Sequence, residues 1–283
     1  MYRARRNGEN GGRGAGDAAL AAGRPLLGAD DPPPFEIVNP DGGARFALLC
    51  DHASNRVPRA LDNLGLAPED LERHIAWDIG AGAVTRRLAA RFDAPAVIAG
   101  YSRLVIDCNR RLEDQQSILD VSDGTPVPGN RNLTARDAAA RAKACFRPYH
   151  QACAAVLAGV EARGGTAPVV IVHSFTPVFE GHRRPWHIGI LWHEDGRIAR
   201  PLLEALRRRR DLCVGDNEPY DGASPHGYTM PAHCARHGRA NVQIEVRQDL
   251  VADAAGVERW SEVLFDALAG ILADPGLYLR RTA

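Results

Sequence analysis

Three short apolar runs, each followed at once by ionisable residues, constrain the fold of this chain more than any other feature. They are Ala47–Cys50, followed by Asp51-His52; Val169–Val172, followed by His173; and Val242–Ile244, followed by Glu245. Runs of this length and composition are typical of strands buried on both faces of a sheet. Because functional groups of open α/β sheets gather at the carboxyl ends of the strands, we expect these side chains to meet at one site.

Segments with helical spacing separate the apolar runs. The clearest helical segments are Ala135–Arg163, Arg197–Arg208 and Val257–Leu272, and a helix opening at Pro68 is interrupted near Asp78. Strands and helices that alternate in this way predict an α/β fold, with three αβα layers around a mixed, mainly parallel central sheet. Further strands are predicted at Phe35–Val38, Ala96–Ile98, Leu104–Ile106 and His187–Trp192.

The N-terminal segment differs in composition from the rest of the chain. Residues 1–33 are rich in Gly, Ala and Arg and end in Asp-Asp-Pro-Pro-Pro. Such a segment buries too little apolar surface to offset its ordering entropy. We therefore expect residues 1–33 to be a disordered tail, or the product of an over-extended start site, and residues 34–283 to form a single α/β domain.

The overall composition narrows the classes of partner. The chain has 35 basic and 35 acidic residues. It therefore lacks the excess of basic residues that would favour binding to nucleic acid or to an anionic membrane. No apolar run approaches the roughly 20 residues that span a bilayer, and the N-terminus lacks the apolar core of a signal peptide. The six cysteines form no CxxC pair and are expected to be reduced thiols of a cytoplasmic protein.

The two histidines at strand ends point to a divalent metal. A catalytic zinc ion commonly takes three protein ligands, drawn from His and carboxylates, together with a water. His52 and His173 would supply two of these ligands, although a single loop histidine more often bonds backbone. The third ligand is left open between Asn55, three residues after His52, and Asp78, whose other reading is a helix cap.

Glu245 is the candidate general base. A carboxylate that ends a buried strand either finds a partner or has a raised pKa. A raised pKa suits a group that takes a proton from water and later passes it to a leaving amine. The alternative is a structural ion pair between Glu245 and Arg247.

Basic and amide side chains near the next predicted strand suggest an acidic substrate. Arg103 precedes that strand, and Asn109 and Arg110 follow it. Arginine binds carboxylates in a two-pronged fashion, and asparagine adds a directional amide. Two further candidates for substrate contact are His233, whose loop leads into the strand that bears Glu245, and Arg247, which follows Glu245 by two residues.

At these residues the chain resembles the N-formylglutamate amidohydrolase family. The resemblance runs from about Phe35 to Leu272 and is carried by stretches such as DHASNRVP, HIAWDIGA, YSRLVIDCNR, HSFTPVF and IEVRQDL. It implies a phosphorylase/hydrolase-like fold similar to that of zinc carboxypeptidases and aspartoacylases. Their sites run in the order HxxE, Asn-Arg, His and Glu, and this chain shows the same order, but with Asn55 at the position of the ligand Glu.

The resemblance also implies an activity. It is the zinc-dependent hydrolysis of N-formyl-L-glutamate to formate and glutamate, a late step of histidine breakdown, with Asn109 and Arg110 holding a substrate carboxylate and Arg103 stabilising the oxyanion. Two alternatives stay open: hydrolysis of another acyl-amino acid or small peptide, and non-catalytic binding of acidic metabolites. The sequence predicts no oligomeric state.

Overall fold

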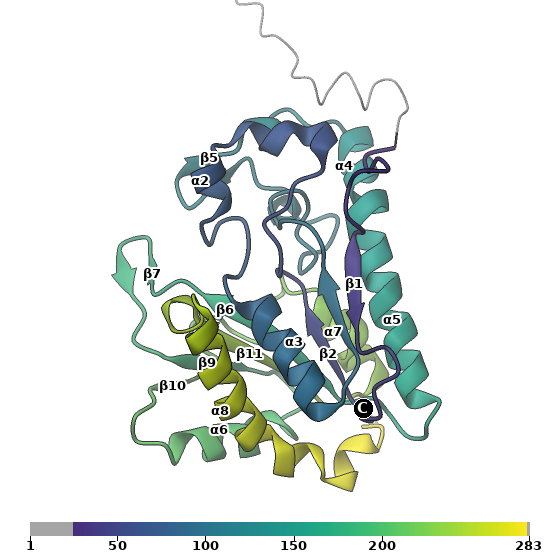
Figure 1. The fold of residues 1–283 in the computed structure, drawn as a ribbon, viewed down its shortest axis with the longest axis vertical. Helices are drawn as coiled ribbons and strands as arrows, with labels where there is room; N and C mark the ends of the chain where they lie inside the picture. The colour runs from purple at the N-terminus through teal and green to yellow at the C-terminus, as the bar shows by residue number, and fades with distance from the viewer. Residues whose placement is uncertain (1–24, 282–283) are drawn as a thin grey trace, which may run out of the picture.

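Seven strands form one mixed sheet through the middle of the computed structural model, which describes residues 25–281 (Figure 1). In spatial order they are β1 (Phe35–Val38), β3 (Ala96–Ala99), β2 (Ala47–Cys50), β6 (Val169–Phe175), β11 (Asn241–Arg247), β9 (Ile188–Leu191) and β10 (Val214–Asp216). The four strands β3, β2, β6 and β11 run parallel, whereas β1 is antiparallel to β3, and β9 is antiparallel to β11 and parallel to β10. The predicted α/β class with a mixed, mainly parallel sheet is confirmed.

Helices cover both faces of this sheet (Figure 1). One face carries α3 (Ala81–Phe92), α6 (Ala199–Arg207) and α8 (Ala254–Leu272), and the other carries α5 (Arg147–Glu161) and α7 (Thr229–His233). Successive strand side chains point to opposite faces, so each strand feeds both cores. In β2, Leu48 and Cys50 pack in the α3–α8 core, and Ala47 and Leu49 pack against α5. The continuous apolar composition of the central strands follows from this double burial.

The predicted helix at 135–163 forms with one interruption. It begins as α4 (Ala135–Arg141), where Thr134 and Asp137 make a capping box, passes through a π-helical turn at Ala142–Phe146, and continues as α5. Pro148 has no N–H group to donate to the preceding turn, which accounts for the irregular backbone just before it.

Short elements complete the structure. They are α2 (Pro68–Leu71), the strand pairs β4 (Val121–Ser122) with β5 (Thr125–Pro126) and β7 (Val178–Phe179) with β8 (His182–Arg183), and the 3-10 turns η1 (Arg59–Gly65), η2 (Gln115–Ser117), η3 (Pro128–Asn130), η5 (Ala235–His237), η6 (Gln248–Leu250) and η7 (Pro275–Tyr278). The short elements from α2 to η3 lie at one end of the sheet, and Thr125 of β5 accepts a hydrogen bond from Arg73 just after α2.

The predicted strand at 104–106 is wrong. These residues form turns, in which the Val105 N–H donates to the carbonyl of Ser102. The run is apolar because it is buried in a separate core with Leu64 and Phe146. Both edges of β3 are already paired, with β1 and β2, so no adjacent edge was open to it.

The predicted disordered tail, residues 1–33, is described by the structure only from residue 25 onwards. Residues 1–24 lie outside the described residues, so disorder there stays a prediction. Residues 25–33, by contrast, pack on the domain: Leu26 is buried, and the Tyr101 hydroxyl donates to the carbonyl of Pro32 at 2.6 Å. Among residues 25–281, no helix is both long and apolar enough to cross a membrane.

Candidate active site

The three side chains selected from strand ends line one cavity. Strand β6 lies between β2 and β11, and Glu245 stands directly beside His173 in the register of β11 and β6. His52 follows β2 by two residues, so it emerges from the sheet at the same end. All three line a cavity of about 600 Å³. Parallel pairing of three adjacent strands therefore gathers residues that are far apart in the sequence.

The Nε2 atom of each imidazole is hydrogen-bonded to a carboxylate. His52 Nε2 lies 2.6 Å from Asp107 Oδ1, and His173 Nε2 lies 3.1 Å from Asp51 Oδ2. A carboxylate oxygen only accepts, so each Nε2 carries the proton of that hydrogen bond. The Nδ1 atoms of both rings face a third carboxylate, Asp78 Oδ2, at 3.4 Å for His52 and 2.7 Å for His173.

Asp78 is positioned by the loop that precedes α3. Its backbone N–H donates to the carbonyl of His52, and its Oδ2 also accepts from the backbone N–H of Ser174. The next turn needs Gly80, whose φ of 80° is left-handed and whose position would bring a Cβ within 2.2 Å of the carbonyl oxygen of Val251. The loop thus packs closely against Val251, and the Asp78 carboxylate lies between the two imidazole rings.

Interactions between charged side chains outweigh burial in setting the pKa values of the two histidines and Asp78. Burial by itself lowers the pKa of His173, but the carboxylates of Asp51 and Asp78 outweigh burial and hold that pKa well above its usual value. Burial and Arg103 also lower the pKa of His52, yet Asp107 and Asp78 raise it overall. Burial would raise the pKa of Asp78, but the two histidines lower it. The site is therefore a buried network in which three carboxylates raise the pKa values of two imidazoles.

Glu245 is buried and only partly satisfied. Its Oε1 accepts a hydrogen bond from the Gln243 amide at 2.9 Å, while its Oε2 has no hydrogen-bond partner among the described residues. Burial raises the pKa of Glu245 to about 7, against the opposing charge of His173. A carboxyl group with this pKa can both accept and donate a proton near neutral pH.

The side chains of His52, His173 and Asp78 fit a metal ion. One nitrogen of each ring and one carboxylate oxygen lie within 4.8 Å of one another. His52 Nδ1 is buried and has no hydrogen-bond partner in the described part of the chain. The second ring nitrogen of a metal-bound histidine usually donates its N–H to a carboxylate or carbonyl oxygen, as both rings do here. Nitrogen and carboxylate donors in this number are those of catalytic zinc sites.

The predicted substrate contacts Arg103, Asn109 and Arg110 also line the cavity. The Arg103 guanidinium donates to Asp107 at 2.9 Å and lies 3.4 Å from Asp78, so its charge is shared with both carboxylates. The side-chain oxygen of Asn109 accepts from the backbone of α7 and the residue before it, which leaves its NH2 group as the end available to a ligand. Arg110 donates to the carbonyl of Asn109.

Three other predicted site residues do not line the cavity. The Asn55 amide donates to Glu72 at 3.0 Å, so the structure turns it away from the two rings. Arg247 pairs with Asp249 at 2.8 Å rather than with Glu245, which excludes the alternative of a Glu245–Arg247 ion pair. His233 stacks on His150, outside the cavity.

Asp51 and Asp107 were not among the predicted site residues. Both are buried, with exposed fractions of 1% and 4%, and each holds a histidine. Asp51 adjoins His52 but bonds His173, on the neighbouring strand. The general pairing of metal histidines with carboxylates indicates that such residues exist, but only the tertiary structure pairs each aspartate with its ring.

Comparisons with known proteins find similarity in both sequence and fold. A family model described as N-formylglutamate amidohydrolase matches residues 44–252. The crystal structure of a gene product from Agrobacterium tumefaciens is 33% identical, with a TM-score of 0.84, over 88% of this chain and 98% of that one. The structure of N-formylglutamate amidohydrolase from Ralstonia eutropha is 20% identical, with a TM-score of 0.66, over 84% of this chain and 97% of that one. No curated protein matches this chain.

Proposed function

The chain belongs to the N-formylglutamate amidohydrolase family, and we propose that it hydrolyses N-formyl-L-glutamate to formate and L-glutamate with the help of a bound zinc ion. One observation carries the proposal: two carboxylate-backed histidines, Asp78 and a half-satisfied Glu245 face the same cavity. This combination provides ligands for a cation and an acid–base group beside it. The cytoplasmic location and the place in histidine breakdown stay predictions from the sequence.

His52 Nδ1, His173 Nδ1 and the Asp78 carboxylate would hold the zinc ion. A zinc ion supplies Lewis-acid chemistry, which polarises a carbonyl and lowers the pKa of water to about 7. Between the two third ligands considered from the sequence, Asp78 is favoured, because Asn55 bonds Glu72 and does not line the cavity. Asp51 and Asp107 fix the rings so that both Nδ1 atoms face Asp78.

Glu245 transfers the proton. Its carboxylate removes a proton from the attacking water, whose oxygen bonds to the acyl carbon, and it delivers that proton to the nitrogen as the C–N bond breaks. The remaining hydroxyl proton of the cleaved acid passes through solvent to the amine. Formate and the ammonium form of glutamate are then released, and Glu245 is again ionised. Its pKa of about 7, raised by burial, suits both halves of this exchange.

Cationic and amide groups bind the acidic substrate. Arg110 and the Asn109 NH2 group hold a carboxylate, and the partly neutralised Arg103 stabilises negative charge on the acyl oxygen. Arg247 and His233 are left out of this site because neither lines the cavity.

A formate-release assay on zinc-loaded protein, combined with elemental analysis, tests the proposal. We expect turnover of N-formyl-L-glutamate, one active-site metal, and loss of both on His52→Ala. Formate release that is unaffected by a chelator would contradict the role of the metal. Absence of both turnover and active-site metal would instead leave a binder of acidic metabolites.

A second candidate substrate class follows from the size of the cavity. At about 600 Å³ it lies within the range of sites for drug-sized ligands, so it has room for a larger acyl group or a small peptide. Rates on N-formylglutamate, N-acetylaspartate and a dipeptide panel would separate these substrates. A higher kcat/KM on an acetylated or peptide substrate would favour this second reading.

A further inference from the structure

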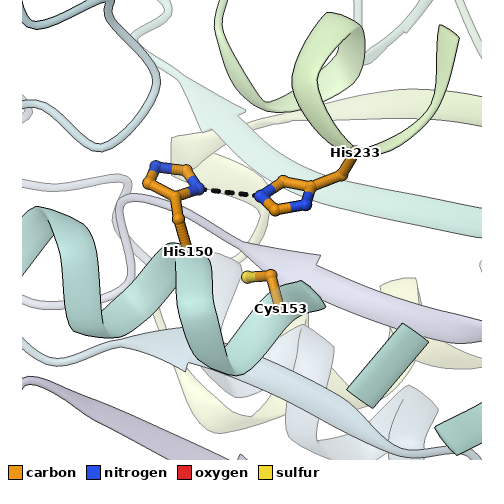
Figure 2. Close-up of side chains that lie close together, drawn as sticks. All are labelled: His150, Cys153 and His233. Carbon is orange, nitrogen blue, oxygen red and sulfur yellow. Dashed lines mark hydrogen bonds between the residues drawn. The ribbon is translucent and has the colours of Figure 1, made fainter. Parts of the chain in front are cut away.

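A second group of metal-ligating side chains lies between α5 and α7 (Figure 2), and none of its members lines the active-site cavity. His150 and Cys153 come from α5, where a spacing of three residues puts them on one helix face, and His233 is the last residue of α7. Their ligand atoms all lie within 4.8 Å of one another. All three are buried.

Hydrogen bonding fixes the orientation of His150. Its Nε2 lies 2.9 Å from the carbonyl oxygen of Cys108, which can only accept, so Nε2 carries a proton. The lone pair of Nδ1 therefore points at His233 Nε2, 2.9 Å away, as the dashed line in Figure 2 shows. A ring nitrogen directed at the cluster, with the other nitrogen donating to a backbone carbonyl, is the arrangement of a metal-bound histidine.

The surroundings favour neutral rings and an added cation. Burial lowers the pKa of His150 and lowers that of His233 to about 4, so both rings are neutral at pH 7 and able to coordinate. Cys153 is fully buried, which raises the pKa of its thiol. The ionised carboxylate of Asp51 lies close enough to act electrostatically on all three residues. Asp51 would attract a cation at this position, whereas the Arg239 guanidinium, which also acts on His233, would oppose it.

We propose that His150 Nδ1, Cys153 Sγ and His233 Nε2 bind a structural zinc ion that fastens α7 to α5. A nitrogen and thiolate donor set suits zinc, with distances of about 2.0–2.1 Å to nitrogen and about 2.3 Å to sulfur. On binding, the Cys153 thiol loses its proton to solvent and the S–Zn bond forms. The proton that His233 Nε2 donated to His150 Nδ1 passes through solvent to His233 Nδ1, which frees both facing nitrogens, and the hydrogen bond between the two rings is given up. This site is independent of the metal and substrate proposed above.

Because α7 lines part of the active-site cavity, an ion that fixes α7 would also affect the active site. Met230 and Pro231, in the middle of α7, line the active-site cavity. Asp51, which holds His173, also accepts hydrogen bonds from Tyr149 beside His150 and from Thr229 at the start of α7. Fixing α7 to α5 would therefore fix one wall of the cavity and the support of one active-site histidine.

Cobalt substitution tests the proposal, because cobalt bound to a thiolate gives a strong charge-transfer band in the near ultraviolet. Every protein carries Cys213→Ser, since Cys213 is an exposed thiol that can bind metal by itself. The full chain, its His52→Ala variant and its Cys153→Ala variant are stripped with a chelator, loaded with Co²⁺ and gel-filtered. Cys145→Ala, which removes another buried cysteine, is the matched control.

We expect two cobalt ions per chain and the band in the parent. His52→Ala keeps one ion and the band, Cys153→Ala keeps one ion without the band, and Cys145→Ala behaves as the parent. A parent without the band, or a Cys153→Ala variant that keeps it, overturns the proposal. A His52→Ala variant with the parent's metal content would refute the active-site metal while leaving this site supported.

Should Cys153→Ala fail to fold, X-ray absorption of the zinc-loaded parent gives the decision without a variant. A sulfur shell at about 2.3 Å supports the site. A shell made of nitrogen and oxygen alone overturns it.

Discussion

Replacing Glu245 with glutamine should abolish turnover and, at the same time, stabilise the metal-free chain above pH 7. Glutamine keeps the shape and the oxygen that accepts from Gln243, but it cannot ionise. If Glu245 transfers the proton, kcat should fall by about 10²–10⁴, the usual contribution of a positioned acid–base group. The wild-type rate should also fall about tenfold per pH unit below the pKa of Glu245, because only the ionised carboxylate can accept the proton.

The effect on stability follows from the same pKa. Burial raises the pKa of Glu245 from 4.5 to about 7, so the folded chain binds more protons than the unfolded chain between these values. The contribution of this group to stability is therefore fully present below pH 4.5 and is lost as the pH rises through 7. At about 1.36 kcal/mol per pH unit, the loss amounts to about 3 kcal/mol, which the Glu245→Gln variant avoids.

The assays are formate release at pH 8 and urea unfolding at pH 5 and pH 8, with a chelator present in the unfolding experiments. The variant should gain stability over the wild type between pH 5 and pH 8. Glu161→Gln is the control: the hydrogen bond from Arg239 lowers the pKa of Glu161 below 4.5, so this variant should lose stability about equally at pH 5 and pH 8. Turnover within tenfold of the wild type would refute the proton-transfer role, and a stability difference that does not grow with pH would refute the raised pKa.

Further expectations concern other residues. Asp78→Ala should remove the active-site metal and destabilise the fold by about 3–5 kcal/mol, since both buried rings lose their shared carboxylate; elemental analysis and urea unfolding measure this. Asn55→Ala should leave kcat/KM within twofold, since its amide bonds Glu72 outside the cavity; loss of metal would show that Asn55 is a ligand after all. Arg110→Leu should raise KM for N-formylglutamate at least tenfold with a smaller change in kcat, by steady-state kinetics. Burial lowers the pKa of His233 from 6.5 to about 4, so between these pH values the unfolded chain binds more protons than the folded chain. The free energy of unfolding of the metal-free chain should therefore fall by up to about 3 kcal/mol as the pH drops through this range. His233→Gln should remove this part of the acid dependence in urea unfolding.

The sequence was informative where local periodicity and strand polarity decide the outcome. The apolar runs before His52, His173 and Glu245 were enough to predict that these residues gather at one end of the sheet, because the three strands run parallel. The predicted strand ends were early, since β6 and β11 continue for two residues beyond His173 and Glu245. The same reasoning failed at Leu104–Ile106, because a buried turn and a buried strand share the same apolar composition.

Loop side chains show what a linear sequence leaves open. Asn55 occupies the expected ligand spacing yet turns to Glu72, while Asp78, in the loop before α3, is held between the two rings. Asp51 bonds the histidine of the neighbouring strand rather than its own neighbour in the chain. The direction of such side chains depends on contacts between distant segments, which no local pattern encodes.

The chain by itself therefore determined the layered α/β architecture, the family and the edge of the sheet at which chemistry is expected, because these depend on hydrophobic pattern and strand direction. Only the packed structure decided which carboxylate faces the two imidazoles, which aspartates hold them, and that His150, Cys153 and His233 converge between α5 and α7. Those choices depend on the distances between side chains from separate elements, and such distances exist only once the elements have packed together.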